Sequence, residues 1–165
     1  MTTWLWPLFE GPCALPDEPG QFGAIRRHDV HTGVDLYTYP GMPVLAVEDG
    51  TVVSVEKFTG PDAGSPWWND TQAVLVEGAS GVVVYGEMIP LDKVQVGADV
   101  LRGDCLGCVR TVLRQDKGRP TTMLHLELMR PGSRETVWWQ HGEEMPACLL
   151  DPTRHLERAL EERGR

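Results

Sequence analysis

Positive charge is scarce in this sequence. Its 15 Lys and Arg residues are outnumbered by 24 Asp and Glu residues, which gives a formal net charge of −9 at pH 7. The only two adjacent basic residues are Arg26 and Arg27. Proteins that bind nucleic acids or anionic membrane surfaces normally display a patch of Lys and Arg. We therefore expect neither a nucleic acid nor a membrane as a partner.

Long apolar segments are also absent. No stretch approaches the ~20 consecutive apolar residues that a membrane-spanning helix needs. The first residues, MTTWLWPLFEGP, contain no basic residue, and Pro7 and Glu10 interrupt their apolar run. A secretory signal needs both a basic start and a continuous apolar region. The sequence therefore predicts a cytoplasmic protein.

Cysteines are few and form no recognisable disulfide framework. A chain of 165 residues can bury a hydrophobic core without disulfide bonds, so we expect a single domain over residues 1–165. Cys105 and Cys108 form a C-x-x-C pair, which is compatible with a redox pair, with half of a zinc site, or with two structural residues around a turn. The sequence has no second C-x-x-C, so it favours the structural interpretation.

Short runs rich in β-branched residues recur between Gly, Pro and Asp. Many short strands at close spacing favour antiparallel sheets over alternating strands and helices. We therefore expect a mainly β domain of antiparallel sheets, built as a sandwich or an open barrel. Glu48-Asp49-Gly50, between two of these runs, predicts a hairpin, because Gly readily adopts the positive φ of such turns. The predicted strands lie within residues 43–47, 51–56, 73–77, 81–89, 99–103, 105–109 and 123–129.

The C-terminal end is the one segment with a helical pattern. Asp151 is a good N-cap, and Pro152 suits the first position of a helix. Apolar residues then recur at helical spacing. We predict a short helix over residues 152–163.

A long loop is predicted over residues 57–72, which contain several Gly and Pro residues. The loop also contains Trp67 and Trp68. Exposed tryptophans make good binding surfaces, so these two are candidates to border a substrate groove. The alternative is that one or both of them cover the hydrophobic core.

The sequence contains one set of candidate metal ligands. His31 and Asp35 are four residues apart in HTGVD, so both point to the same side of an extended chain, and Gly33 between them allows a close approach of another backbone. In the predicted strand MLHLELM, alternation puts His125 on the face opposite three leucines. Two His and one Asp provide the mixed nitrogen and oxygen ligands that suit Zn²⁺, with a fourth position for water.

Three segments occur in a fixed order along the chain: HTGVDL with the following PGMPVLAVEDGTVVSVE, then VQVGADVLRGDCLGCV, then TMLHLELMRPG. Together they resemble the lysostaphin-type zinc endopeptidases, which cut peptide stems or cross-links of bacterial peptidoglycan. The resemblance covers about residues 28–130. It implies Zn²⁺ as the cofactor, His31, Asp35 and His125 as its ligands, and a peptide or peptidoglycan-like substrate.

Two positions depart from the family pattern. The family has histidines that do not bind the metal at the position of Met123 and in a Y-x-H-L segment, which corresponds here to Tyr85-Gly86-Glu87-Met88. By this match Glu87 stands beside the ion, as a general base or as a fourth ligand that closes the site. Met123 cannot donate a hydrogen bond to a developing oxyanion. Further candidates for the surroundings of the ion are Glu127, Tyr85 and His28.

Two functions are compatible with this pattern. The first is a divergent zinc-dependent amide hydrolase, because the ligands are kept and a carboxylate stands at the altered position. The alternative is a non-catalytic binding module that keeps zinc for stability or recognition. A third interpretation comes from a likeness of the same hairpin and turn to domains that carry biotin or lipoate. It ranks below the others, because Lys57, Lys93 and Lys117 lack the expected neighbours.

Overall fold

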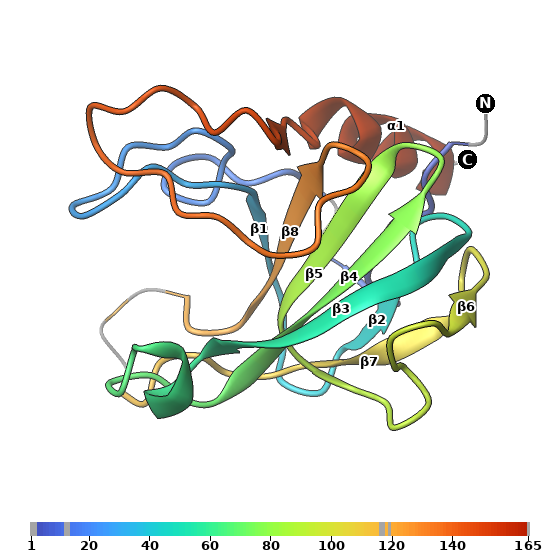
Figure 1. The fold of residues 1–165 in the computed structure, drawn as a ribbon, viewed down its shortest axis with the longest axis horizontal. Coiled ribbons are helices and arrows are strands. Elements are labelled where there is room, and N and C mark those ends of the chain that lie inside the picture. Colours follow the sequence, from blue (N-terminus) through green and yellow to red (C-terminus); the bar gives the residue numbers. More distant parts are fainter. Residues whose placement is uncertain (1–2, 12–13, 116–117, 119, 165) are drawn as a thin grey trace.

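The computed structural model describes residues 3–11, 14–115, 118 and 120–164. Within these residues the chain is mainly β, with antiparallel strands and a short C-terminal helix, as predicted (Figure 1). The strands form one sheet. The strands are β1 (Val34–Tyr37), β2 (Pro43–Leu45), β3 (Gly50–Thr59), β4 (Thr71–Gly78), β5 (Gly81–Pro90), β6 (Asp99–Val100), β7 (Cys105–Val109), β8 (Met123–Met129) and β9 (Leu149–Leu150). The helices are the 3₁₀ turn η1 (Pro61–Ala63) and α1 (Thr153–Arg163).

The sheet brings segments together that are far apart in the sequence. Its main path runs β1-β8-β5-β4-β3-β6, with β7 beside β5, β2 beside β7 and β9 beside β8. Each predicted strand overlaps an observed one, but β1 and β9 were not predicted. β8 lies between β1 and β5, so its residues face neighbours from the first and the middle thirds of the chain.

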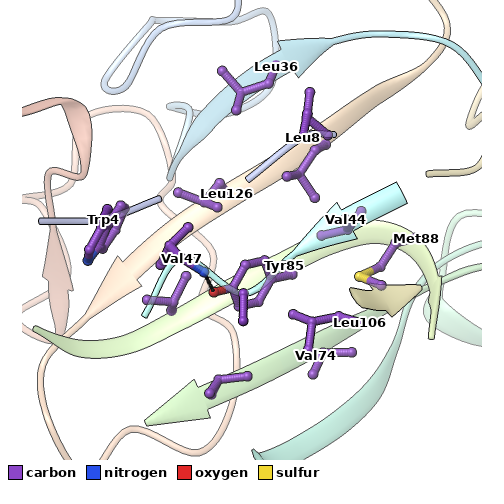
Figure 2. Close-up of a cluster of buried hydrophobic side chains, with 14 of the residues drawn as sticks. Trp4, Leu8, Leu36, Val44, Val47, Val74, Tyr85, Met88, Leu106 and Leu126 are labelled. Carbon is purple, nitrogen blue, oxygen red and sulfur yellow. Dashed lines mark hydrogen bonds between the residues drawn. The ribbon is translucent and has the colours of Figure 1, made fainter. Parts of the chain in front are cut away.

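The main hydrophobic core lies on the face of the sheet that carries the leucines of β8 (Figure 2). Leu124 and Leu126 are fully buried there, as alternation predicts, together with Leu36 of β1 and Tyr85 of β5. The core also takes in residues outside the range 28–130: Trp4, Trp6, Leu8, Leu156 and Ala159. The two ends of the chain therefore complete the main core.

A second, smaller apolar cluster lies on the opposite face of the sheet. It is centred on Ala73, Leu75, Val82, Val84 and Met129. Met129 belongs to the alternating set of β8 that also contains Glu127 and His125. The candidate ligand His125 therefore shares a face with this second cluster.

The predicted loop over residues 57–72 is wrong at both ends. β3 continues to Thr59 and β4 begins at Thr71, and the ladder pairs these two residues directly. Thr59 and Thr71 also share a hydrogen bond between their hydroxyl groups at 2.7 Å. The β-branched and aromatic residues at the ends of the segment extend the sheet, so the connection without strand structure is shorter than predicted.

The hairpin predicted at residues 48–50 is also wrong. β2 pairs with β7, whereas β3 pairs with β4 and β6, so the strands on either side of Gly50 are not partners. Gly50 serves a different purpose. A Cβ atom there would lie 2.5 Å from the carbonyl oxygen of Glu77 on β4, so a residue without a side chain allows the two backbones to approach.

The helix α1 begins one residue later than predicted. The Asp151 carboxylate accepts a hydrogen bond from the Thr153 backbone N–H at 2.9 Å, which fits the capping role predicted for it. No helix in the described part of the chain has the length and apolar character to cross a membrane. Lys117, one of the lysines considered as a carrier site, lies outside the described residues.

The C-x-x-C pair lies within β7, not around a turn. Cys105 and Cys108 are both free and half-buried. Their backbone partners are Leu45 and Pro43 of β2. Neither residue belongs to the group of possible metal ligands found among the described residues.

Candidate metal centre

His31, Asp35 and His125 meet at the pairing of β1 with β8. Asp35 in β1 lies directly opposite His125 in β8, so the two side chains project from the same face of the sheet. His31 enters from the segment just before β1. A Cβ atom on Gly33 would lie 2.4 Å from the carbonyl oxygen of Leu126, which confirms the predicted close approach at this glycine.

The three side chains point one atom each at a common centre. His31 Nε2 lies 3.1 Å from Asp35 Oδ1 and 3.1 Å from His125 Nδ1. Asp35 Oδ1 lies 2.9 Å from His125 Nδ1. Bonds of about 2.0–2.1 Å at tetrahedral angles put zinc ligands about 3.3 Å apart, so this triangle is close to the size that zinc requires. Across residues 3–11, 14–115, 118 and 120–164, these three form the group that could hold a metal ion.

Hydrogen bonds on the far side of each imidazole fix its orientation. His31 Nδ1 donates to the backbone carbonyl of Gln21 at 2.9 Å, which leaves the lone pair of Nε2 facing the centre. His125 Nε2 donates to Glu127 Oε1 at 2.8 Å, which leaves Nδ1 as the ring nitrogen that faces the centre. Metal-binding histidines almost always engage their second nitrogen in this way. The residues present therefore fit a zinc ion.

The electrostatics of the centre favour positive charge. Burial alone would raise the pKa of Asp35, but hydrogen bonds from His125 and His31 hold it well below its usual range. Burial disfavours a charged His125, but the hydrogen bonds from its ring to Asp35 and Glu127 raise its pKa to about 10. Without a metal, a proton on His125 neutralises part of the surrounding negative charge. A divalent cation would take over that role.

Glu127 holds His125 from the side away from the centre. It is 1% exposed, and its Oε1 also accepts a hydrogen bond from the Thr32 hydroxyl at 2.5 Å. Thr32 lies next to His31, so this bond ties β8 to the segment that carries the first ligand. Glu127 Oε2 is buried and has no hydrogen-bond partner among the described residues.

Glu87 lies on a bulge of β5 next to the centre. Gln72 of β4 pairs with Met88, and Val74 pairs with Tyr85, so Gly86 and Glu87 together face one residue of β4. Glu87 has φ of 63°, an uncommon conformation for a residue with a side chain. Such bulges often redirect a side chain beside an active site.

Glu87 is half-buried as a residue, but its Oε2 is buried and has no hydrogen-bond partner among the described residues. This burial, together with the negative charge of Asp35, raises the pKa of Glu87 to about 8. Its neighbour on the bulge, Gly86, pairs with His125. Glu87 is therefore a carboxylate beside the three candidate ligands, with one oxygen free of protein contacts in the described residues.

An aromatic ring from β3 packs against the centre. The ring of Phe58 lies 5.4 Å from that of His125, measured between centroids. A Cβ atom on Gly86 would lie 3.0 Å from Phe58, so glycine at this position makes room for the ring. Phe58 falls in the segment that was predicted to be a loop, and its role was therefore missed.

The other residues named from the sequence around the ion are Tyr85, His28 and Met123, and they lie in three different surroundings. Tyr85 is on the opposite face of the sheet, in the main core, where its hydroxyl accepts a hydrogen bond from the Val47 N–H at 2.9 Å (Figure 2). Its position does not support a role beside an ion. His28 is exposed on the segment before His31. Met123 lies two residues from His125 on β8, and opposite Tyr37.

Trp67 and Trp68 lie in the connection between β3 and β4. Trp67 is 61% exposed, Trp68 is half-buried, and their rings meet edge to face with centroids 6.1 Å apart. The connection leaves the sheet soon after Phe58, which packs on His125. A role in a substrate groove stays a prediction.

Three further residues around the centre were missed from the sequence: Arg26, Gln21 and Thr32. Arg26 did carry a signal, since it belongs to the only basic pair, but that pair was considered only as a possible patch for polyanions. Gln21 acts through its backbone carbonyl, which no side-chain pattern reveals. No motif in the sequence singles out Thr32, and only the folded structure reveals its hydrogen bond to Glu127.

Comparisons with known proteins identify the family. The model of Peptidase family M23 matches residues 29–137, which is more than half of the chain. The chain belongs to peptidase family M23. This confirms the lysostaphin-type resemblance of the three sequence segments. No curated protein matches the chain.

Solved structures similar to this M23 chain support the fold. They include a putative peptidase M23 from Pseudomonas aeruginosa (TM-score 0.56, 19% identity, 93% of this chain and 50% of that one). A zinc containing peptidase from Vibrio cholerae has a TM-score of 0.55 and 22% identity, over 88% of this chain and 41% of that one. Lysostaphin has a TM-score of 0.51 and 20% identity, over 79% of this chain and 44% of that one. The chain thus spans half or less of each of these three proteins.

Proposed function

We propose that this chain is a zinc-dependent peptide hydrolase that acts on peptidoglycan-type peptides. The observation that carries the proposal is the convergence of His31 Nε2, Asp35 Oδ1 and His125 Nδ1 within 3.1 Å of one another. Membership of peptidase family M23 supports the reaction class. A structurally similar protein is described as a zinc containing peptidase, which supports the choice of metal.

The three ligands leave room for a fourth position on a tetrahedral ion. A zinc ion held by these three residues would supply a Lewis acid and would lower the pKa of a water bound at its fourth position. Glu87 would serve as the proton acceptor for the attacking water through Oε2, the oxygen without a hydrogen-bond partner among the described residues. A nearby cation favours the ionised carboxylate that a base requires, which opposes the effect of burial on its pKa.

Two further residues near the centre, Phe58 and Met123, affect the proposed reaction. Phe58 forms an apolar wall against His125 and limits access of water from that side. Met123 provides no hydrogen-bond donor for an oxyanion, so a metal held by the three candidate ligands would have to stabilise it without help from this position. We expect slower turnover than in an enzyme with a donor at this position, by about 10²- to 10³-fold.

Hydrolysis of purified peptidoglycan and of an oligoglycine peptide, with and without added zinc, tests the proposal. We expect cleavage that is lost on chelation and restored by zinc. His31→Ala should abolish both zinc binding and cleavage, whereas His28→Ala, in the exposed segment just before it, should retain both. A protein that binds zinc and cleaves neither substrate would rule out the hydrolase.

A non-catalytic binding module is the second candidate. The observation in its favour is that Met123 and Glu87 occupy the two positions at which the family has histidines that do not bind metal. In this case zinc stabilises a surface that binds a wall peptide without cutting it. Saturable binding of the peptide with no product after prolonged incubation would support the module over the enzyme.

A further inference from the structure

One short segment holds two of the three candidate ligands. Residues 19–26, which we term the collar segment, run alongside the residues that lead into β1. The Gly20 carbonyl accepts the Asp35 backbone N–H at 2.9 Å. The Gln21 carbonyl accepts the His31 Nδ1–H at 2.9 Å, and the backbone of His31 is bonded to the same segment in both directions.

Arg26 ends the collar segment and reaches back into the centre. Its Nη2 donates to Asp35 Oδ2 at 2.7 Å, and the Asp35 side chain is only 4% exposed. Its Nε and Nη2 also donate to the Pro19 carbonyl at 3.3 and 3.0 Å. The guanidinium is planar and its donors have fixed directions, so the Pro19 contact determines where Nη2 points.

The two oxygens of Asp35 therefore have separate partners. Oδ1 faces His31 and His125, whereas Oδ2 faces Arg26. A carboxylate can bind a metal through one oxygen or through both. With Oδ2 held by a guanidinium, only Oδ1 is directed at the centre.

We propose that Arg26 is a positioning residue that reserves Asp35 Oδ2 and so limits Asp35 to one metal bond through Oδ1. This inference rests on the proposed zinc site. The proposal accounts for an arginine at this place. A fixed positive charge beside a metal ion repels the ion, so Arg26 does not help to bind the metal through its charge. Instead, Arg26 keeps one position of a tetrahedral ion open, because a second Asp35 oxygen would compete for that position.

The test measures coordination directly, in the full chain loaded with Co²⁺ or Zn²⁺. Arg26→Met and Arg26→Gln remove the guanidinium. Arg26→Lys keeps the charge and one donor group. Arg27→Met is the matched control, because Arg27 is adjacent, carries the same charge and is exposed. The readouts are the visible spectrum of the Co²⁺ form and the X-ray absorption fine structure of the Zn²⁺ form, with thermal unfolding as a check on folding.

We expect Arg26→Met and Arg26→Gln to gain one metal–oxygen contact and a longer mean metal–ligand distance. The Co²⁺ spectrum should shift from a four-coordinate to a five-coordinate type. Arg26→Lys should recover the wild-type spectrum at least in part, and Arg27→Met should match wild type. Wild-type coordination in either neutral Arg26 variant, with any change confined to affinity, would reduce Arg26 to an electrostatic role and overturn the proposal. A wild-type protein that binds no metal would instead refute the proposed zinc site itself.

Discussion

His125 and Glu127 lie two residues apart on one face of β8, and His125 Nε2 donates to Glu127 Oε1 at 2.8 Å. This contact decides which nitrogen of His125 is free. Because Nε2 donates to Glu127, Nδ1 is the ring nitrogen that faces His31 and Asp35. It can bind a metal through its lone pair once its own proton is released. The period of two in a strand thus puts a candidate ligand and the group that orients it on the same surface.

Replacement of Glu127 should weaken zinc binding. Glu127→Leu removes the acceptor for His125 Nε2, and we expect a loss of about 10- to 100-fold in zinc affinity. Glu127→Gln should retain most of the affinity, since its amide oxygen can accept the same hydrogen bonds from His125 and Thr32. Competition titration with a chelator measures both values. Equal affinity in Glu127→Leu and wild type would show that the orientation of His125 does not depend on this contact.

Glu87→Gln tests the proposed base. The amide keeps the size of the side chain but cannot take up a proton, so we expect kcat to fall by about 10²- to 10⁴-fold while zinc content stays the same. Glu144→Gln, at an exposed position far along the chain, serves as the control. Peptide cleavage and metal analysis on the same samples provide the comparison. Undiminished turnover in Glu87→Gln would exclude the residue as the base.

The sequence predicted the sheet more reliably than its connections. The alternation of leucines in β8 depends only on which face is buried, and the structure has Leu124, Leu126 and Leu128 in the main core. The pairing of strands is a property of the whole chain. Residues 48–50 have the composition of a hairpin turn, yet β2 pairs with β7, because tertiary contacts override a local turn preference.

The candidate site was predictable where side-chain types carry the signal. His31, Asp35 and His125 are of residue types that commonly bind zinc, and they were proposed as ligands from their spacing and from family resemblance. The residues that orient them act through geometry instead. The contribution of Gln21 is a backbone carbonyl, and that of Arg26 depends on a segment folding back onto β1. Sequence patterns do not encode either contact.

Gly33→Ala should disturb both stability and the site. The added Cβ atom would lie 2.4 Å from the Leu126 carbonyl oxygen, a backbone atom that cannot move without shifting β8. We expect a loss of about 1–3 kcal/mol in the free energy of unfolding, together with weaker zinc binding. Gly11→Ala is the matched control, since its Cβ atom would have no neighbour within 4 Å. Urea denaturation measures the difference, and equal stability of the two variants would refute the close packing at Gly33.

His155 should make the stability of the protein depend on pH. Its ring stacks on that of Trp4 with centroids 4.4 Å apart. Burial, assisted by the positive charge of Arg158, lowers the pKa of His155 below its ordinary value of 6.5, although Glu48 partly opposes this shift. The unfolded chain therefore takes up the proton more readily than the folded chain. The contribution of uncharged His155 to the free energy of unfolding is fully present above about pH 6.5. It is lost as the pH falls from there through the pKa of His155 in the folded chain.

The corresponding experiment compares free energies of unfolding at about pH 7.5 and about pH 5.5. His155→Phe keeps an aromatic ring against Trp4 but cannot bind a proton, so it should lose less stability than wild type between the two pH values. His28→Asn, at an exposed position, should behave as wild type. Measurements without metal, in the presence of a chelator, keep the zinc ligands from adding their own pH dependence through metal release. If wild type and His155→Phe lose the same stability, protonation of His155 is not coupled to folding, and the acid sensitivity must come from other groups.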